Sequence, residues 1–190
     1  LENTLIIFSS DNGSPQRDGT NMGGAIASVN KYGHDPSRPW KGMKADIWEG
    51  GHRVPFIAAW PKRIKANTVS DQVICLTDVI ASVASILGIE KGKGEMEDSF
   101  DISPILFGNE TTVRTSIIHH SIDGTFAIRK GNWKLILGKD SGGFSKNLKI
   151  KGIPVETEGQ LYNLSKDPSE NSNRYAMHPD KVKELTYLLN

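Results

Sequence analysis

The stretch that decides the fold is TLIIFSSDNG, residues 4–13. Residues 4–10 are continuously apolar and then hydroxylic, which is typical of a buried strand in a parallel sheet. The run stops at Asp11-Asn12-Gly13, so a carboxylate and an amide oxygen follow directly after the strand. Calcium and magnesium take oxygen ligands, and ligand sites in open α/β sheets lie beyond the carboxyl ends of strands. This pattern favours a cation site.

The same residues also allow a plain turn, because Asn-Gly is the strongest short hairpin signal. A hairpin needs a second apolar strand, whereas residues 14–18 read SPQRD. Gly13 permits a sharp turn, so the side chains of Asp11 and Asn12 can converge on one ion. From these residues alone, the cation site and the plain turn remain equally open.

A second informative segment is KGMKADIWEGGHRVP, residues 41–55. It holds two lysines around a glycine, then a Gly-Gly turn that leads into an apolar strand. A lysine held near a bound cation is well placed for an anionic substrate. Glu49 and Arg53 are expected to form a structural ion pair beside this turn.

These two segments together resemble the second part of a formylglycine-dependent sulfatase, of the arylsulfatase-type branch of the alkaline phosphatase-like superfamily. FAIRKGNWKLI, residues 126–136, resembles the small-domain hairpin of that family. QLYNLSKDPSEN, residues 160–171, resembles its closing Leu-Tyr-x-Leu-x-x-Asp-Pro-x-Glu signature. The four matches occur in family order and cover nearly the whole chain. The resemblance implies an α/β fold, with part of the large α/β domain in residues 1–100 and a small subdomain, an antiparallel sheet plus a C-terminal helix, in residues 101–190.

The resemblance also implies roles for single residues. Asp11 and Asn12 would bind calcium, rather than magnesium, together with acidic ligands from the other half of the family sequence. Lys44 stands five residues before Glu49 and matches the catalytic lysine that contacts the sulfate. A fixed ammonium stabilises the charge that builds on the leaving oxygen. Lys41 is given a supporting role in substrate binding.

Four histidines are candidates for substrate contact, since histidine can act as acid, base or donor near neutral pH. For each one singly, a packed or exposed histidine without such a role is the favoured interpretation. The candidates are His34, His52, His119 and His120.

The family's nucleophile is a formylglycine made from Cys or Ser in Cys/Ser-x-Pro-x-Arg, and this chain lacks that motif. Before Pro36-Ser37-Arg38 the required position holds His34, and Cys75 is followed by Leu76-Thr77-Asp78. The resemblance therefore implies the C-terminal portion of a sulfuric ester hydrolase, acting on a sulfated carbohydrate or aryl sulfate. The missing N-terminal part would be its partner and would supply the formylglycine. The fragment alone is expected to be inactive.

Periodicity predicts the remaining elements. Apolar spacing predicts a helix over residues 77–87, with Thr77 as N-cap and Gly88 as the stop. Pro179 opens a last helix with an apolar face of Val182, Leu185, Leu188 and Leu189. Short strands are expected at residues 54–60, 116–120, 125–129, 133–138 and 161–164, with a hairpin turn at Gly131-Asn132.

Composition is that of a soluble globular chain: 190 residues, 37% hydrophobic, 24% charged and a net charge of +1. It indicates neither nucleic-acid binding nor a membrane span, which needs about 20 apolar residues. Cys75 is the only cysteine. No signal peptide is recognised in a chain that starts at Leu1, and the resemblance implies a periplasmic, secreted or lysosome-like compartment.

Two rival functions remain open. One is a phosphatase or phosphodiesterase of the same superfamily. The other is a non-catalytic module that binds sulfated glycans through a basic strip, although a run of charges is more often a solvated face. The strip consists of Arg129, Lys130, Lys134, Lys139, Lys146, Lys149 and Lys151.

Overall fold

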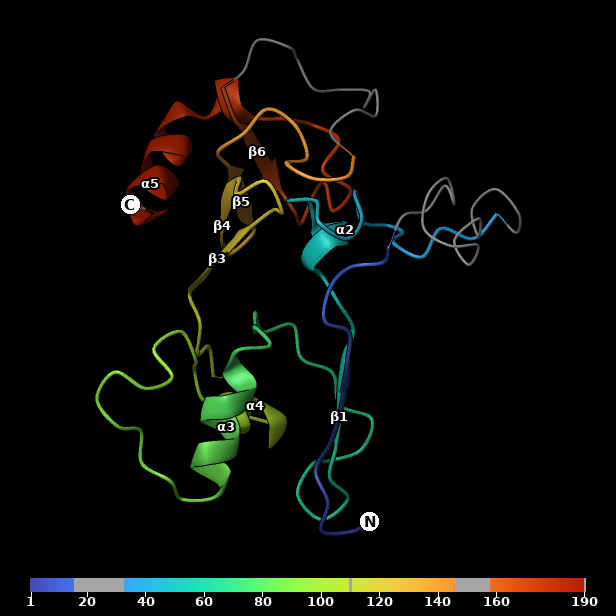
Figure 1. Cartoon of the computed structure of the whole chain (residues 1–190), viewed down its shortest axis with the longest axis vertical. Helices are drawn as coiled ribbons and strands as arrows, with labels where there is room; N and C mark the ends of the chain where they lie inside the picture. The colour runs from blue at the N-terminus through green and yellow to red at the C-terminus, as the bar shows by residue number, and fades with distance from the viewer. Residues whose placement is uncertain (16–32, 110, 146–157, 190) are drawn as a thin grey trace. The chain divides into compact units, whose positions relative to one another are not determined.

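The computed structural model describes residues 1–15, 33–109, 111–145 and 158–189 (Figure 1). Its elements are β1 (Ile6–Ser9), α2 (Glu49–His52), β2 (Phe56–Ala59), α3 (Asp78–Ile86), α4 (Ser103–Leu106), β3 (Ser116–His120), β4 (Phe126–Lys130), β5 (Trp133–Ile136), β6 (Gln160–Asn163), a 3₁₀ turn (Tyr175–Met177) and α5 (Pro179–Leu189). This mixed α/β content, with two sheets and a C-terminal helix, confirms the predicted fold class. No helix in these ranges is both long and apolar enough to cross a membrane.

The chain divides into two compact units. Residues 1–9 and 56–117 form the first, and residues 10–55 and 118–190 form the second. The predicted domain boundary near residue 100 is not tested by this division and stays a prediction. Every candidate site residue falls in the second unit.

In the first unit, β1 pairs antiparallel with β2, with Ile6 opposite Ala59 and Ser9 opposite Phe56. The prediction of a buried, parallel-type strand is therefore wrong for the chain described here. Its side chains alternate between exposed and half-buried, and Phe8 is 61% exposed. A continuous apolar run predicts burial only where layers cover both faces of the strand.

Helix α3 was predicted in the right place, with Gly88 at φ +68° just beyond its end. The inner face of this helix is partly polar, because Asp78 and Ser82 are buried while Ile80 is exposed. Asp78 accepts hydrogen bonds from the N–H groups of Cys75 (2.7 Å) and Phe100 (3.0 Å) and pairs with Arg114. Satisfied polar groups can thus occupy the inner face of a helix.

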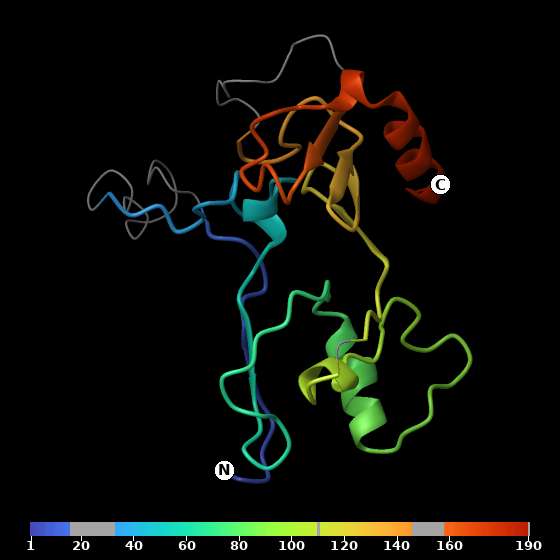
Figure 2. The ribbon, with the colours of Figure 1, turned by 180° about the vertical axis from the view of Figure 1, so that it is seen from behind.

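The second unit is built on a four-stranded sheet in the order β3-β4-β5-β6, with β4–β5 and β5–β6 antiparallel. The predicted hairpin is confirmed: Lys130 pairs with Trp133, and Gly131 lies in the turn at φ +56°. Side chains alternate between the two faces of the sheet. Ile128, Leu135 and Leu161 pack with Leu185 of α5 on one face. Figure 2 shows the red ribbon of α5 beside this sheet.

The opposite face of this sheet carries the segment that contains the candidate site. Ala127, Ile136 and Tyr162 form a buried cluster with Ile47 and Trp48. Trp48 directly precedes α2, which lies beside the sheet in Figure 1. The small sheet is therefore the platform on which residues 41–55 are held.

Candidate active-site segment

The Asp-Asn loop after β1 is held by short local hydrogen bonds. Ser10 Oγ donates to the Asn12 carbonyl (2.9 Å), and Asn12 Nδ2 donates to the Gly13 carbonyl (3.0 Å). The amide nitrogen of Asn12 is thus engaged, which leaves Oδ1 as the oxygen for a cation. Asp11 is exposed, and no ion pair is found for its carboxylate among the residues described.

Glycines let this loop lie directly on the lysine-bearing segment. The Gly13 N–H donates to the Gly51 carbonyl at 2.9 Å. A Cβ placed on Gly13 would lie 1.9 Å from the Gly50 oxygen, and one on Gly50 would lie 2.4 Å from the Gly42 oxygen. These distances are far below van der Waals contact, so only glycine permits the approach. The two segments that the sequence analysis singled out are brought together by backbone contact.

Lys44 stands on a tight turn. The Asp46 N–H donates to the Met43 carbonyl (3.0 Å), which closes the turn over residues 43–46, and Ala45 takes φ +78°. A positive φ at this third position is the mark of a type II turn, where glycine is usual. The Lys44 N–H donates to the Ser14 carbonyl at 2.7 Å, so the turn is anchored to the Asp-Asn loop.

A buried aspartate supports the turn from inside. The Asp46 carboxylate accepts hydrogen bonds from the N–H groups of Met43 (2.9 Å) and Ser145 (2.9 Å), and from Ser145 Oγ (2.5 Å). The Ile47 N–H donates to the Ser141 carbonyl at 2.8 Å. The loop after β5 therefore helps to fix the backbone that carries Lys44.

Lys41 is held by the protein itself. Its Nζ donates to the Glu170 carbonyl at 2.9 Å and lies 4.4 Å from the centre of the Trp48 ring. Burial lowers the pKa of Lys41, while the nearby charges of Glu170 and Asp167 oppose that shift. These contacts give Lys41 a scaffolding position, and its contact with substrate stays a prediction.

Glu49 is the centre of a buried ion network. The predicted pair with Arg53 is present at 3.7 Å, and Glu49 also pairs with Lys134 (3.0 Å) and Arg129 (3.6 Å). Burial would raise the pKa of Glu49, but the surrounding cations outweigh it and lower the pKa. Glu49 therefore keeps its charge inside the protein.

Glu170 completes this network. Its Oε2 accepts the Glu49 N–H at 2.7 Å, and its Oε1 lies 3.1 Å from Lys134 Nζ, an ion pair whose angles are not those of a hydrogen bond. Burial raises the pKa of Glu170, against the lowering effect of Lys134. Lys134 thus forms ion pairs with the carboxylates of both Glu49 and Glu170.

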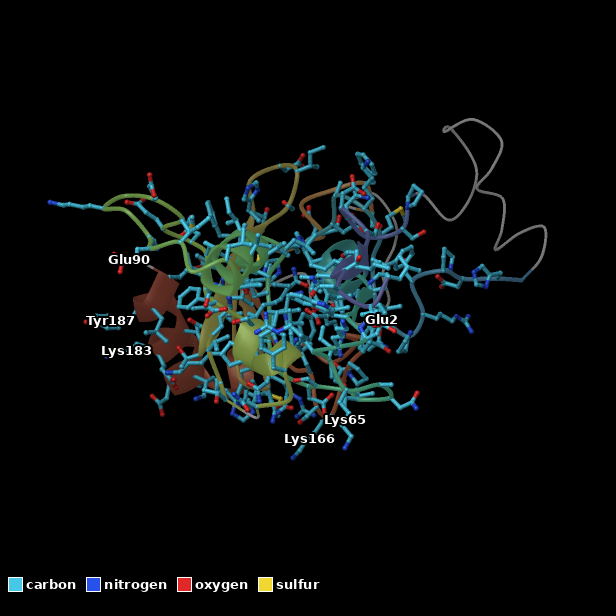
Figure 3. The ribbon with its side chains drawn as sticks, turned by 90° about the horizontal axis from the view of Figure 1, so that it is seen from below. Glu2, Lys65, Glu90, Lys166, Lys183 and Tyr187 are labelled. Carbon is cyan, nitrogen blue, oxygen red and sulfur yellow. The ribbon has the colours of Figure 1, made fainter. Side chains whose placement is uncertain are left out.

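The prediction that the basic strip is a solvated face is wrong at Lys134, whose side chain is 0% exposed. Its neighbour in the strip, Arg129, pairs with Glu49. By contrast, Lys166 and Lys183 extend from the surface in Figure 3. Lys134 points into the unit because alternate residues of β5 face residues 47–49. Lys146, Lys149 and Lys151 lie outside the described residues.

Two of the four candidate histidines pack against each other. The rings of His52 and His119 are 4.3 Å apart, centre to centre, and the Nε2 atom of each is buried without a hydrogen-bond partner. Burial, followed by the charge of Lys134, lowers the pKa of His52 to about 4 and that of His119 well below 6.5. Both rings are therefore neutral at pH 7.

The other two histidines lie outside this pair. His34 is exposed. His120 is also exposed, with its Nδ1 2.8 Å from the Ser121 carbonyl and its ring 5.7 Å from that of Phe126. Substrate contact stays a prediction for all four histidines.

The donor set fits part of a calcium site. Within residues 1–15, 33–109, 111–145 and 158–189, no group of three or more His, Cys, Asp or Glu side chains could hold a metal. Asp11 and Asn12 supply a carboxylate and an amide oxygen, the ligand types that calcium prefers, but calcium takes six to eight oxygens. The two residues could hold calcium only together with ligands from elsewhere.

Three residues that support the candidate segment from inside were not given that role from the sequence, namely Lys134, Glu170 and Asp46. Lys134 and Glu170 stand inside the two family-like segments, residues 126–136 and 160–171, and that placement was the available signal. Their charges suggested exposure, since buried Lys and Glu are rare unless paired. Only the folded chain shows that each is the other's partner.

A turn that presents a lysine beside a carboxylate-amide loop suits the binding of an anion next to a cation. Residues 1–89 match the family model described as Sulfatase. An N-acetylgalactosamine-6-O-sulfatase of Bacteroides thetaiotaomicron is 35% identical over 99% of this chain and 36% of its own length. Human arylsulfatase A is 29% identical over 91% of this chain and 34% of its own length.

Solved structures are also similar to this chain. A structure from a study of the metabolism of multiple glycosaminoglycans by Bacteroides thetaiotaomicron superimposes with a TM-score of 0.80 at 34% identity, over 99% of this chain and 38% of that chain. A sulfatase from Pseudoalteromonas sp. gives a TM-score of 0.73 at 26% identity, over 99% and 36%. The chain thus resembles sulfatases of the alkaline phosphatase-like superfamily over nearly its whole length. It spans about a third of the length of these relatives.

Proposed function

We propose that this chain supplies part of the active site of a sulfuric ester hydrolase that acts on a sulfated carbohydrate. One observation carries the proposal: the turn that bears Lys44 is bonded to the Asp11-Asn12 loop, through Lys44 N–H to the Ser14 carbonyl and Gly13 N–H to the Gly51 carbonyl. The resemblance to sulfatases and the carbohydrate named for its Bacteroides relative support it.

Each residue has a separate task in this proposal. The Lys44 ammonium binds the sulfate and stabilises the negative charge that develops on the leaving oxygen. Asp11 and Asn12 would hold calcium together with ligands from elsewhere, and calcium would supply polarisation of the sulfate oxygens. The nucleophile is a formylglycine from outside the chain. The family resemblance further suggests a periplasmic, secreted or lysosome-like compartment.

The test is an assay of the complete protein that contains this chain. It is incubated with calcium and oligosaccharides that carry N-acetylgalactosamine 6-sulfate, and released inorganic sulfate is measured. An aryl sulfate and an aryl phosphate are run in parallel. Release of sulfate from the glycan, with little release of phosphate, is the expected result. Phosphate release without sulfate release would favour the phosphatase alternative, and no release of either would favour a binding module.

A further inference from the structure

We propose that Glu170 is a positioning residue that clamps both ends of the loop carrying Lys44. The inference rests on the proposed function, because it assigns Glu170 an effect on the same reaction. Glu170 contacts the candidate substrate-binding residue Lys41, and it acts on Lys44 only through residues 41–49.

The clamp consists of two hydrogen bonds from one residue. The Glu170 carbonyl accepts Lys41 Nζ at 2.9 Å, and its Oε2 accepts the Glu49 N–H at 2.7 Å. Residues 41 and 49 bracket the turn over residues 43–46. The Gly50 N–H closes the loop internally on the Lys41 carbonyl at 2.7 Å. A displacement of Glu170 would therefore free both ends of the loop together.

The backbone of Glu170 shows that this arrangement has a cost. Its φ is +52°, a conformation that favours glycine, and its side chain is fully buried. Burying a carboxylate is unfavourable unless a cation accompanies it, and here Lys134 does so at 3.1 Å. Strain of this kind persists where the surroundings enforce it, often at functional sites. A glycine would satisfy the backbone but could not bind the Glu49 N–H.

A double-mutant cycle in the complete protein distinguishes positioning from general support. Glu170→Ala removes the acceptor of the Glu49 N–H and is expected to lower kcat/KM on the order of tenfold, since coupled neighbours show interaction energies of this scale. In a Lys44→Ala background the same change should have almost no further effect, because the side chain it positions is gone. Equal fold losses in the two backgrounds would overturn the proposal.

Glu170→Gly is the second variant, because it removes the carboxylate while relieving the positive φ. Its effect on kcat/KM should likewise disappear in the Lys44→Ala background, as for Glu170→Ala, even if its thermal stability is higher. Glu184→Ala is the matched control, since Glu184 is an exposed glutamate that pairs with Lys130. If Glu170→Gly retains full kcat/KM, the carboxylate positions nothing.

Backbone hydrogen exchange gives a readout that needs no enzymatic activity. In Glu170→Ala the amides of Lys44 and Gly50 should exchange at least several-fold faster than in the unsubstituted protein, while those of β4 and β5 stay unchanged. Unchanged protection at Lys44 and Gly50 would contradict the clamp. If the unsubstituted protein releases no sulfate, the proposed function is wrong. Hydrogen exchange then still tests whether Glu170 orders residues 41–49.

Discussion

Ala45 shows how the conformation of one residue serves the candidate site. It adopts φ +78° directly after Lys44, although a left-handed backbone conformation is about 1–2 kcal/mol less stable for an L-residue. Ala45→Gly should raise the free energy of unfolding by up to about 1 kcal/mol, because glycine adopts this φ without a steric penalty. Urea denaturation measures the change.

Gly42→Ala is the opposing substitution in the same loop. Gly42 has φ +83°, and a Cβ there would lie 3.0 Å from Asp46 Oδ2. It should lower the urea midpoint, whereas Ala45→Gly raises it. Midpoints that move together in one direction would show that backbone conformation does not limit stability in this loop.

The Asp-Asn loop carries a second prediction at the residue scale. In the complete protein, Asp11→Ala should reduce calcium affinity and turnover together, because it removes a charged oxygen ligand. Asn12→Ala should reduce both less, since it removes a neutral one. Calcium titration of the sulfatase rate measures both effects. Unchanged turnover in Asp11→Ala at limiting calcium would mean that the loop is only a turn.

At the scale of elements, sequence periodicity predicted where the helices and strands lie better than it predicted which of their side chains are buried. The hairpin of β4 and β5 and the helices α3 and α5 follow from local patterns. The ion network of Glu49, Lys134 and Glu170 does not, because its members are up to 121 residues apart and each looks like a surface charge. Whether a side chain is buried depends on which other elements pack against it. The pattern within one segment does not specify those elements.

Helix α2 and strand β3 meet at the His52–His119 pair, and this contact predicts a dependence of stability on pH. Burial and Lys134 hold both pKa values below 6.5, that of His52 at about 4. Between pH 6.5 and 4 the unfolded chain binds more protons than the folded one. Stability from this pair is complete above pH 6.5 and decreases as the pH falls towards 4.

The experiment compares urea midpoints of the chain at pH 7 and pH 4.5 with those of His52→Gln/His119→Gln. Glu49, Arg129 and His120 also influence these rings, so the difference between the two proteins isolates the pair. The midpoint should fall more steeply with acid in the unsubstituted chain. Parallel curves would show that the two rings titrate normally.

At the scale of the molecule, the small sheet and the loop it supports act as one scaffold. Lys134 on β5 and Glu170 after β6 hold the start of α2, and α2 in turn lies against the Asp-Asn loop. The similarity to a sulfatase extends over 99% of the chain, so the aligned region includes both the scaffold and the candidate site. By itself the chain is predicted to release no sulfate, because it contains no formylglycine motif.

The central claim is that Lys44 belongs to a sulfate-cleaving site. The measurement that tests it most directly is kcat for sulfate release by the complete protein carrying Lys44→Ala, Lys41→Ala or Lys62→Ala. Lys62 is the control, because it is an exposed lysine whose only described ion pair is with Glu2. Lys44→Ala should lower kcat by about 10²–10³-fold, the scale of one lost oxyanion donor, with a smaller loss for Lys41→Ala and none for Lys62→Ala. Equal rates for Lys44→Ala and Lys62→Ala would contradict the account.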